Sequence, residues 1–315
     1  MNSGKAPGPA SRLPFKQLLL VLGVVATLYA AAILIWGDKP KASLSLLWSW
    51  TGLQAATLCM LNYLLRGIRW RLWMAHYGRH FGWIEGLRLY LAGYSFTPTP
   101  GNVGEAIRGL MLANKPLGTA QGMAIFGAER LADLTCLLLL CTPALVWGLT
   151  HGAVRAVPGL VLAILCTGMV LLAVAAAIFA KYRHRLFKRF PWLLEAWLCL
   201  SVKPLLWFGL TFCAWAAQGL AMWLVCRALD VHMQVITAAG FYALAMVAGA
   251  LSALPAGLGG MEAVLTGLLV LQGAPAGQAL AITVLVRLLT LWLAVAIGVF
   301  ALLYSAAIRK DISFS

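Results

Sequence analysis

Seven charged side chains lie within or beside long apolar stretches of this sequence. They are the residues best suited to bind a ligand or to transfer a proton there. They are Glu105, Arg108, Glu129, Arg130, Asp133, Glu262 and Arg287. A charge at the centre of a bilayer costs at least about 2.5 kcal/mol on insertion scales, so such residues need partners and usually have a role. Arginine suits a phosphate because its planar fork grips two oxygens at once and stays charged when partly buried. We expect these seven residues to bind an anionic or phosphate-bearing group.

The acidic and basic members of this set recur at one spacing. Glu105 and Arg130 are 25 residues apart, and Glu262 and Arg287 are also 25 residues apart. A proline and a glycine cluster precede the sequence Glu-Ala in both places, which predicts two matching turns. The residues of these turns are Pro100, Gly101 and Gly104 in the first, and Pro255, Gly257, Gly259 and Gly260 in the second.

Paired apolar segments interrupted by Gly and Pro are typical of transporters built from two inverted halves, with the binding site between them. The pattern predicts an inverted repeat with halves at about 42–150 and 204–308. Each half has a further arginine upstream, Arg69 and Arg227, expected on opposite sides of the membrane. The alternative is coincidence, because Gly and Pro are common in membrane helices.

In the functional interpretation, Arg130 and Arg287 face a shared cavity. Glu105 and Glu262, at the starts of half-helices, act there as gates or as proton-coupling groups. The structural alternative is local neutralisation, because Arg108 follows Glu105 by three residues and Asp133 follows Arg130 by three, which places each pair on one helix face.

The elements that must position these residues are membrane helices. Of 315 residues, 62% are apolar and 10% are charged, whereas soluble domains carry about 25% charged residues. The mean hydropathy of +0.89 agrees with this. Eight stretches free of Lys, Arg, Asp and Glu are long enough to cross a bilayer. They are 17–37, 42–65, 134–154, 156–180, 204–226, 231–261, 263–286 and 288–308.

We therefore predict an all-α, polytopic integral membrane protein with about six full spans and two broken segments, 89–128 and 254–286. Either broken segment re-enters on one side or crosses as two half-helices. Residues 17–308 form one transmembrane domain.

The net charge of +15 is explained by orientation rather than by a nucleic-acid partner. Most Lys and Arg residues lie in four clusters, and short cytoplasmic loops collect such residues. A cytoplasmic N-terminus (1–16), a cytoplasmic tail (309–315) and a location in the cell inner (plasma) membrane follow. In the cluster at 66–88, we expect an interfacial stretch with Trp70, Trp73 and Trp83 at headgroup level and its arginines in water. The cluster at 181–203 resembles an amphipathic surface helix.

Enzyme signatures are missing from the sequence. It has no HExxH, GxSxG, Walker or Rossmann pattern, and its seven cysteines lack metal-ligand spacing. His76 and His80 are four residues apart but have no acidic ligand nearby in sequence, so a solvated pair is the simpler interpretation. We expect no enzymatic activity, no cofactor and no metal.

Four ordered motifs resemble the transmembrane region of the lysylphosphatidylglycerol synthase family: RGIRWRLWM, GNVGEAIRG, ERLADL, and LPAGLGGMEA followed by an arginine. In that family the membrane region is taken to move lipids between leaflets, and a separate soluble domain transfers the amino acid. The resemblance thus implies lipid translocation and not aminoacyl transfer. Relatives have been linked with hopanoid, glycolipid and polyprenyl-phosphate-linked glycan transport, so the lipid stays open. The motif positions are Arg69, Trp70, Pro100, Gly104, Glu105, Arg108, Glu129, Arg130, Asp133, Pro255, Gly257, Gly259, Gly260, Glu262 and Arg287.

The leading hypothesis is a flippase that moves a lipid with an anionic or phosphate-bearing headgroup by alternating access. A second hypothesis is a non-transporting scaffold that partners a lipid-modifying enzyme, and a third is an intramembrane hydrolase. Substitution of the paired Glu and Arg residues separates the first two, because a scaffold tolerates those changes.

Overall fold

The computed structural model describes residues 44–97, 105, 117–150, 187–252 and 254–312, with a few single positions before 44 and parts of 170–185. Every regular element among these residues is helical, so the prediction of an all-α polytopic membrane protein is confirmed. The first predicted span (17–37), most of 156–180, and the residues Pro100, Gly101, Gly104 and Arg108 lie outside the described residues.

Within the described residues, three helical stretches are long and apolar enough to cross a membrane: 120–148, 204–228 and 276–305. The α-helices are α3 (Trp50–His76), α4 (Trp83–Ala92), α5 (Thr119–Thr150), α7 (Pro191–Ser201), α8 (Pro204–Ala228), α9 (Val235–Leu251), α10 (Gly260–Leu271), α11 (Ala276–Arg287) and α12 (Leu293–Ile312). Short 3-10 turns are η1 (Leu46–Trp48), η2 (Gly93–Phe96) and η5 (Pro255–Gly257), and η6 (Leu288–Trp292) is a π-helical turn that joins α11 to α12.

Local sequence explains where these helices begin. The Ser49 hydroxyl caps α3 by accepting a hydrogen bond from the Gly52 N–H at 3.2 Å. α7 and α8 each begin with a proline, whose fixed φ and missing N–H suit the first helical position. Between α10 and α11 the chain reverses at Gly273, which has a φ of 102°.

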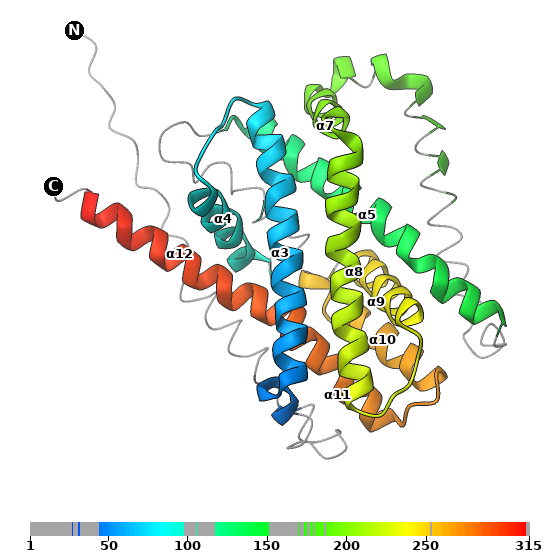
Figure 1. The fold of residues 1–315 in the computed structure, drawn as a ribbon. Coiled ribbons are helices and arrows are strands. Elements are labelled where there is room, and N and C mark those ends of the chain that lie inside the picture. The colour runs from blue at the N-terminus through cyan, green and yellow to red at the C-terminus, as the bar shows by residue number, and fades with distance from the viewer. Residues whose placement is uncertain are drawn as a thin grey trace, which may run out of the picture.

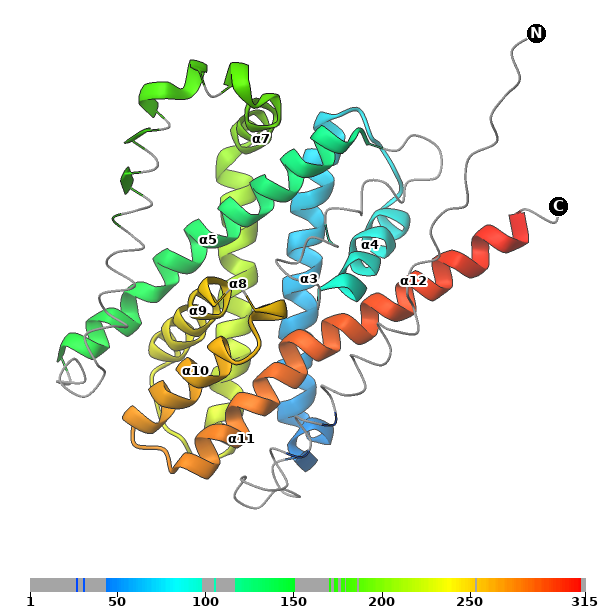
Figure 2. The ribbon, with the colours of Figure 1, turned by 180° about the vertical axis from the view of Figure 1, so that it is seen from behind.

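The two halves pack against each other in a reciprocal way. α3 and α8 lie side by side and run in opposite directions, as the colour gradient of Figure 1 shows. In the first half α4 packs on α12, and in the second half α9 packs on α5. Figure 2 shows α5 and α12 as the two long inclined helices on the other side of the bundle. This exchange of partners is the arrangement expected of an inverted repeat.

The second broken segment, 254–286, holds η5, α10 and most of α11, and its helix α10 turns back along α9. α9 and α10 pack against each other and have 17 and 12 residues, which at 1.5 Å per residue gives about 25 and 18 Å, less than the roughly 30 Å of a bilayer core. α10 returns to the end of the bundle from which α9 starts (Figures 1 and 2). We call α9, η5 and α10 the hairpin, and the turn at 252–259 its tip.

The hairpin tip requires glycine at particular positions. Ala256, Gly257 and Gly259 have φ values of 54°, 68° and 85°, a left-handed region that glycine adopts without steric cost. A Cβ on Gly257 would lie 3.1 Å from the backbone of Gly249, so the two sides of the hairpin touch there. The predicted glycine turn is therefore present in the second half.

The prediction of an interfacial stretch at 66–88 is wrong for its first part. α3 continues past Leu65 to His76, and Trp70 and Trp73 are 2% and 0% exposed. The span was expected to end at residue 65 because Arg66 is the first charged residue after it. Arg66 and Arg69 instead point into the protein, where they form ion pairs with Asp133. Trp83, at the start of α4, is 61% exposed, as expected for a residue at headgroup level.

The arginines upstream of each half also differ. Arg69 is fully buried, whereas Arg227 is exposed in the last turn of α8, with its guanidinium 5.4 Å from the centre of the Trp223 ring. Among the described residues, the correspondence between the two halves therefore includes the Glu–Arg pairs but not this position.

Candidate functional site

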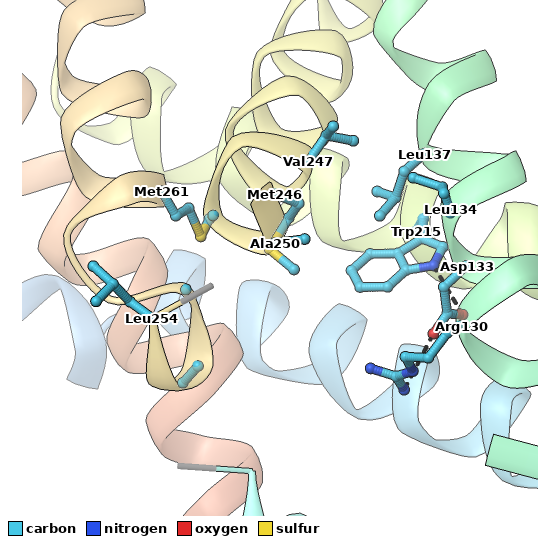
Figure 3. A pocket seen from close by; sticks show the side chains of 13 residues that line it. Arg130, Asp133, Leu134, Leu137, Trp215, Met246, Val247, Ala250, Leu254 and Met261 are labelled. Atoms are coloured by element: carbon cyan, nitrogen blue, oxygen red, sulfur yellow. Dashed lines mark hydrogen bonds and ion pairs between the residues drawn. The ribbon is translucent and has the colours of Figure 1, made fainter. Parts of the chain in front are cut away.

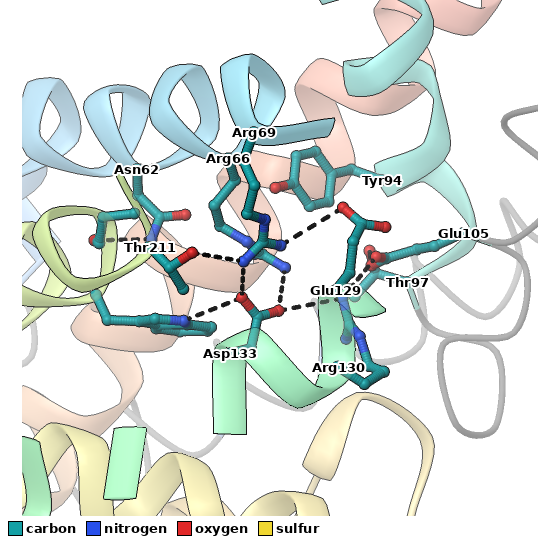
Figure 4. A network of polar contacts seen from close by, with 12 residues as sticks. Asn62, Arg66, Arg69, Tyr94, Thr97, Glu105, Glu129, Arg130, Asp133 and Thr211 are labelled. Atoms are coloured by element: carbon teal, nitrogen blue, oxygen red, sulfur yellow. Dashed lines mark hydrogen bonds and ion pairs between the residues drawn. The ribbon is translucent and has the colours of Figure 1, made fainter. Parts of the chain in front are cut away.

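A network of buried ionic side chains joins α3 to α5. Asp133 lies at its centre and accepts hydrogen bonds from Arg66 at 2.8 Å and from Arg69 at 2.7 Å (Figure 4). A second oxygen–nitrogen contact joins Arg69 to Glu129 at 3.5 Å. Because the two arginines are three residues apart on α3, both guanidinium groups reach the same face of α5.

Arg130 connects this network to the first broken segment. Its guanidinium lies 3.2 Å from the Glu105 carboxylate and 3.4 Å from that of Asp133. Thr97, directly after η2, donates a hydrogen bond to the other Glu105 oxygen at 3.2 Å. The Arg130 side chain is 33% exposed, whereas those of Glu105 and Asp133 are 2% and 7% exposed, so Arg130 is the member that a ligand reaches.

The network is neutral and enclosed by aromatic rings. Trp215 donates its indole N–H to Asp133 at 3.3 Å, and the Arg66 guanidinium lies 5.1 Å from the same ring. Removing one member of a buried ion pair is costly because the other is left without a counter-charge. The named members are three cations and three anions: Arg66, Arg69, Arg130, Glu105, Glu129 and Asp133.

The second half has a smaller ionic site at the hairpin tip. Arg287, the last residue of α11, contacts Glu262 at 2.7 Å, the carbonyl of Ala256 at 2.9 Å and the sulfur of Met261 at 3.1 Å. The other Glu262 oxygen accepts a hydrogen bond from the Gly259 N–H at 2.7 Å. Arg287 thereby holds both the turn and Glu262 of α10, and Glu262 in turn accepts the N–H of Gly259, the residue just before α10.

In both halves the glutamate and the arginine that share the 25-residue spacing are in contact, although the spacing predicted a repeat and not these contacts. The close contact of Arg130 with Asp133 also agrees with the local-neutralisation alternative, so Arg130 has a structural partner as well as an exposed edge. Arg108 lies outside the described residues, so the Glu105–Arg108 pairing stays a prediction. Of the predicted binding residues, Glu129 and Asp133 are both buried, and Asp133 also lines the larger of the two cavities described below.

Sequence reasoning missed several polar residues that face the same interior. Arg66 was assigned to water, and Tyr63, Gln218 and Tyr242 were not considered. The Tyr242 hydroxyl donates to the Gln218 carbonyl oxygen at 2.7 Å, and the Tyr63 hydroxyl donates to the carbonyl of Thr290 in η6 at 2.8 Å. The available signal was an uncharged polar residue, such as Gln218, inside a long apolar run.

Two adjoining cavities lie at these residues. The smaller has a volume of about 100 Å³, and its lining includes Arg66, Glu105, Arg130 and Arg287. Arg130 and Arg287 therefore face one cavity, as the spacing predicted. The larger has a volume of about 330 Å³ and lies between α5, Trp215 and the hairpin (Figure 3). The two share four lining residues, which are Arg130, Trp215, Met246 and Ala256.

The described residues offer no metal site, because no three of their His, Cys, Asp and Glu side chains come together. The cysteines Cys59, Cys136, Cys141, Cys199 and Cys226 are buried.

The sequence matches the family described as lysylphosphatidylglycerol synthase TM region over residues 18–298. The chain belongs to this family. A protein of Methanothermobacter thermautotrophicus, described as a UPF0104 membrane protein, is 32% identical over 106 residues. That match covers 33% of this chain and 32% of the relative, so it spans about a third of the relative's length. The family assignment and the apolar helices both indicate a membrane protein, and the family's description connects it with lipids.

Proposed function

We propose that this member of the lysylphosphatidylglycerol synthase TM region family is a lipid transporter of the cell inner membrane. It moves a lipid with a phosphate-bearing headgroup between leaflets and carries out no chemical step on it. The observation that carries the proposal is the placement of Arg130 and Arg287, one from each half, at a single cavity where each is held by a glutamate.

The chemistry of this cavity suits a phosphate. Guanidinium groups bind phosphate oxygens in pairs and keep their charge when removed from water. The Arg130 side chain is 33% exposed, so a headgroup oxygen reaches its guanidinium group beside Glu105. A lipid needs a polar path only for its headgroup, because its chains stay in apolar surroundings.

The inverted packing of the two halves gives the site a way to change sides. The hairpin tip and the first broken segment meet the cavity through Ala256 and Glu105. Each half carries its own Glu–Arg pair. When one pair opens and the other closes, the cavity becomes accessible from the opposite side of the membrane, while the headgroup stays between the two arginines.

The test is leaflet exchange of chain-labelled fluorescent phospholipids in liposomes that contain the purified protein. We expect Arg130→Ala and Arg287→Ala to lower the exchange rate at least tenfold, and the exposed control Arg227→Ala to leave it within twofold. Because each alanine leaves a glutamate alone, the paired variants Glu105→Gln with Arg130→Gln and Glu262→Gln with Arg287→Gln are measured as well. Folded paired variants that exchange lipid at the wild-type rate contradict the proposal and favour the scaffold.

A further inference from the structure

The larger of the two cavities is an apolar space between α5 and the hairpin. Its volume is about 330 Å³. An apolar cavity of about 150 Å³ is known to hold one benzene ring, so this one has room for about twelve carbon atoms. That is a large part of one lipid chain.

The walls of this cavity favour hydrocarbon over water or a polar group. Leu134 and Leu137 of α5 line one side, and Val247 of α9 lines the hairpin side (Figure 3). The charged side chains Arg130 and Asp133 lie together at one end. Away from that end the walls offer few partners for a polar group, whose burial without a hydrogen bond is costly. The cavity therefore suits an apolar ligand that has a polar group at one end.

The mouth of the cavity is apolar as well. Two of its lining residues are exposed, Ala250 in the last turn of α9 and Leu254 at the hairpin tip. Beside them Leu251 is exposed, and across the gap so is Leu131 of α5, three residues before Leu134. Exposed apolar residues gathered in this way are typical of a surface that contacts lipid. A chain from the hydrocarbon layer of the bilayer thus reaches the cavity without crossing a polar surface.

We infer that one hydrocarbon chain of the transported lipid binds in the larger cavity, which it enters between α5 and the hairpin. The inference rests on the proposed function and adds to it a binding site for the lipid chain. In this arrangement the chain leaves the bilayer while the headgroup is held at the smaller cavity.

Arg130 marks the point where the chain joins the headgroup. It lines both cavities, and its side chain is 33% exposed although it contacts Glu105 and Asp133. These carboxylates balance its charge, so this end of the cavity accepts a lipid ester or phosphate oxygen without selecting one headgroup. The apolar walls, and not the charges, are what select the chain.

The experiment is photolabelling by a phosphatidylglycerol that carries a diazirine midway along one chain. The purified full-length protein is irradiated in liposomes that contain this lipid, and labelled residues are identified by mass spectrometry. We expect label on Leu137 and Val247, which are 6% and 4% exposed and so are shielded from lipids outside the bundle. Label on the exposed Leu139 of α5 reports lipids at the outer surface.

A pair of variants on α9 tests the entry route. Ala250→Phe places a ring at the exposed mouth and is expected to lower the labelling of Leu137 and Val247 at least fivefold. The control Ile236→Phe adds a ring at an exposed position of the same helix outside both cavities, and we expect labelling within twofold of the wild type. Label confined to Leu139 in the wild type overturns the inference. Label on the two buried residues that Ala250→Phe leaves unchanged overturns the entry route.

Leaflet exchange measured on the same samples separates this inference from the proposed function. We expect Ala250→Phe to slow exchange at least fivefold and Ile236→Phe to leave it within twofold. If Ala250→Phe loses the buried label but exchanges lipid at the wild-type rate, transport stands and the inference is wrong. If the wild type is labelled at Leu137 and Val247 but exchanges no lipid, the chain site is supported and the proposed function fails.

Discussion

Asp133→Asn tests whether the buried network stabilises the bundle. Asp133 has contacts with four donor groups, at 2.7 Å (Arg69), 2.8 Å (Arg66), 3.3 Å (Trp215) and 3.4 Å (Arg130). Asparagine keeps the volume but removes the charge and places an amide donor against guanidinium donors. Since breaking a buried ion pair on one side costs about 3–5 kcal/mol, we expect a loss of that size in the free energy of unfolding.

The measurement is reversible chemical unfolding of the purified protein in detergent micelles. Asp230→Asn is the matched control, because Asp230 is exposed and has a φ of 58°, which asparagine also accepts. We expect the control to lie within about 0.5 kcal/mol of the wild type. Combining Asp133→Asn with Arg69→Gln restores charge balance, so the double variant is more stable than additivity predicts, by about 0.5–3 kcal/mol.

Two results refute this reasoning. An Asp133→Asn variant that unfolds within 1 kcal/mol of the wild type shows that the carboxylate charge does not stabilise the packing of α3 on α5. Strict additivity in the double variant shows that Arg69 and Asp133 act independently, despite the 2.7 Å contact between them.

Two further predictions concern glycines. Gly219→Ala on α8 places a Cβ 2.6 Å from the backbone of α9, so we expect it to lower the free energy of unfolding by about 1–3 kcal/mol. The control Gly209→Ala, on the same helix, meets nothing within 4 Å and is expected to be neutral or stabilising. Equal effects of the two variants in an unfolding experiment contradict this prediction. Gly257→Ala and Gly273→Ala both place alanine at a positive φ, at a cost of about 1–2 kcal/mol, and Gly257→Ala also crowds the backbone of Gly249 at 3.1 Å. Only Gly257 lies at the larger cavity, so only its substitution is expected to slow lipid exchange.

The equal spacing of the two glutamates and arginines could be recognised in the sequence, but the contacts within each pair were not predicted from it. The glycine turn of the second half was predictable, since left-handed backbone at Gly257 and Gly259 excludes most other residues.

The burial of Arg66 and Arg69 was not predictable by counting charges. Their partner Asp133 is 67 and 64 residues away in sequence, on a different helix, and no local pattern specifies that contact. A local interpretation assigns RGIRWR to the membrane surface because isolated charges avoid the bilayer. The arginines lie inside because α5 brings its own acidic groups to the same depth.

In the two clusters of described residues the arginines are matched by acids, and this balance determines how the site binds an anion. Each named cluster is neutral: three arginines face three carboxylates in the first, and Arg287 faces Glu262 in the second. An incoming phosphate therefore competes with a carboxylate for a guanidinium, and the affinity is the difference between two similar interactions. Such a difference is small, which suits a transporter, since a lipid bound by unopposed arginines would not leave on the other side.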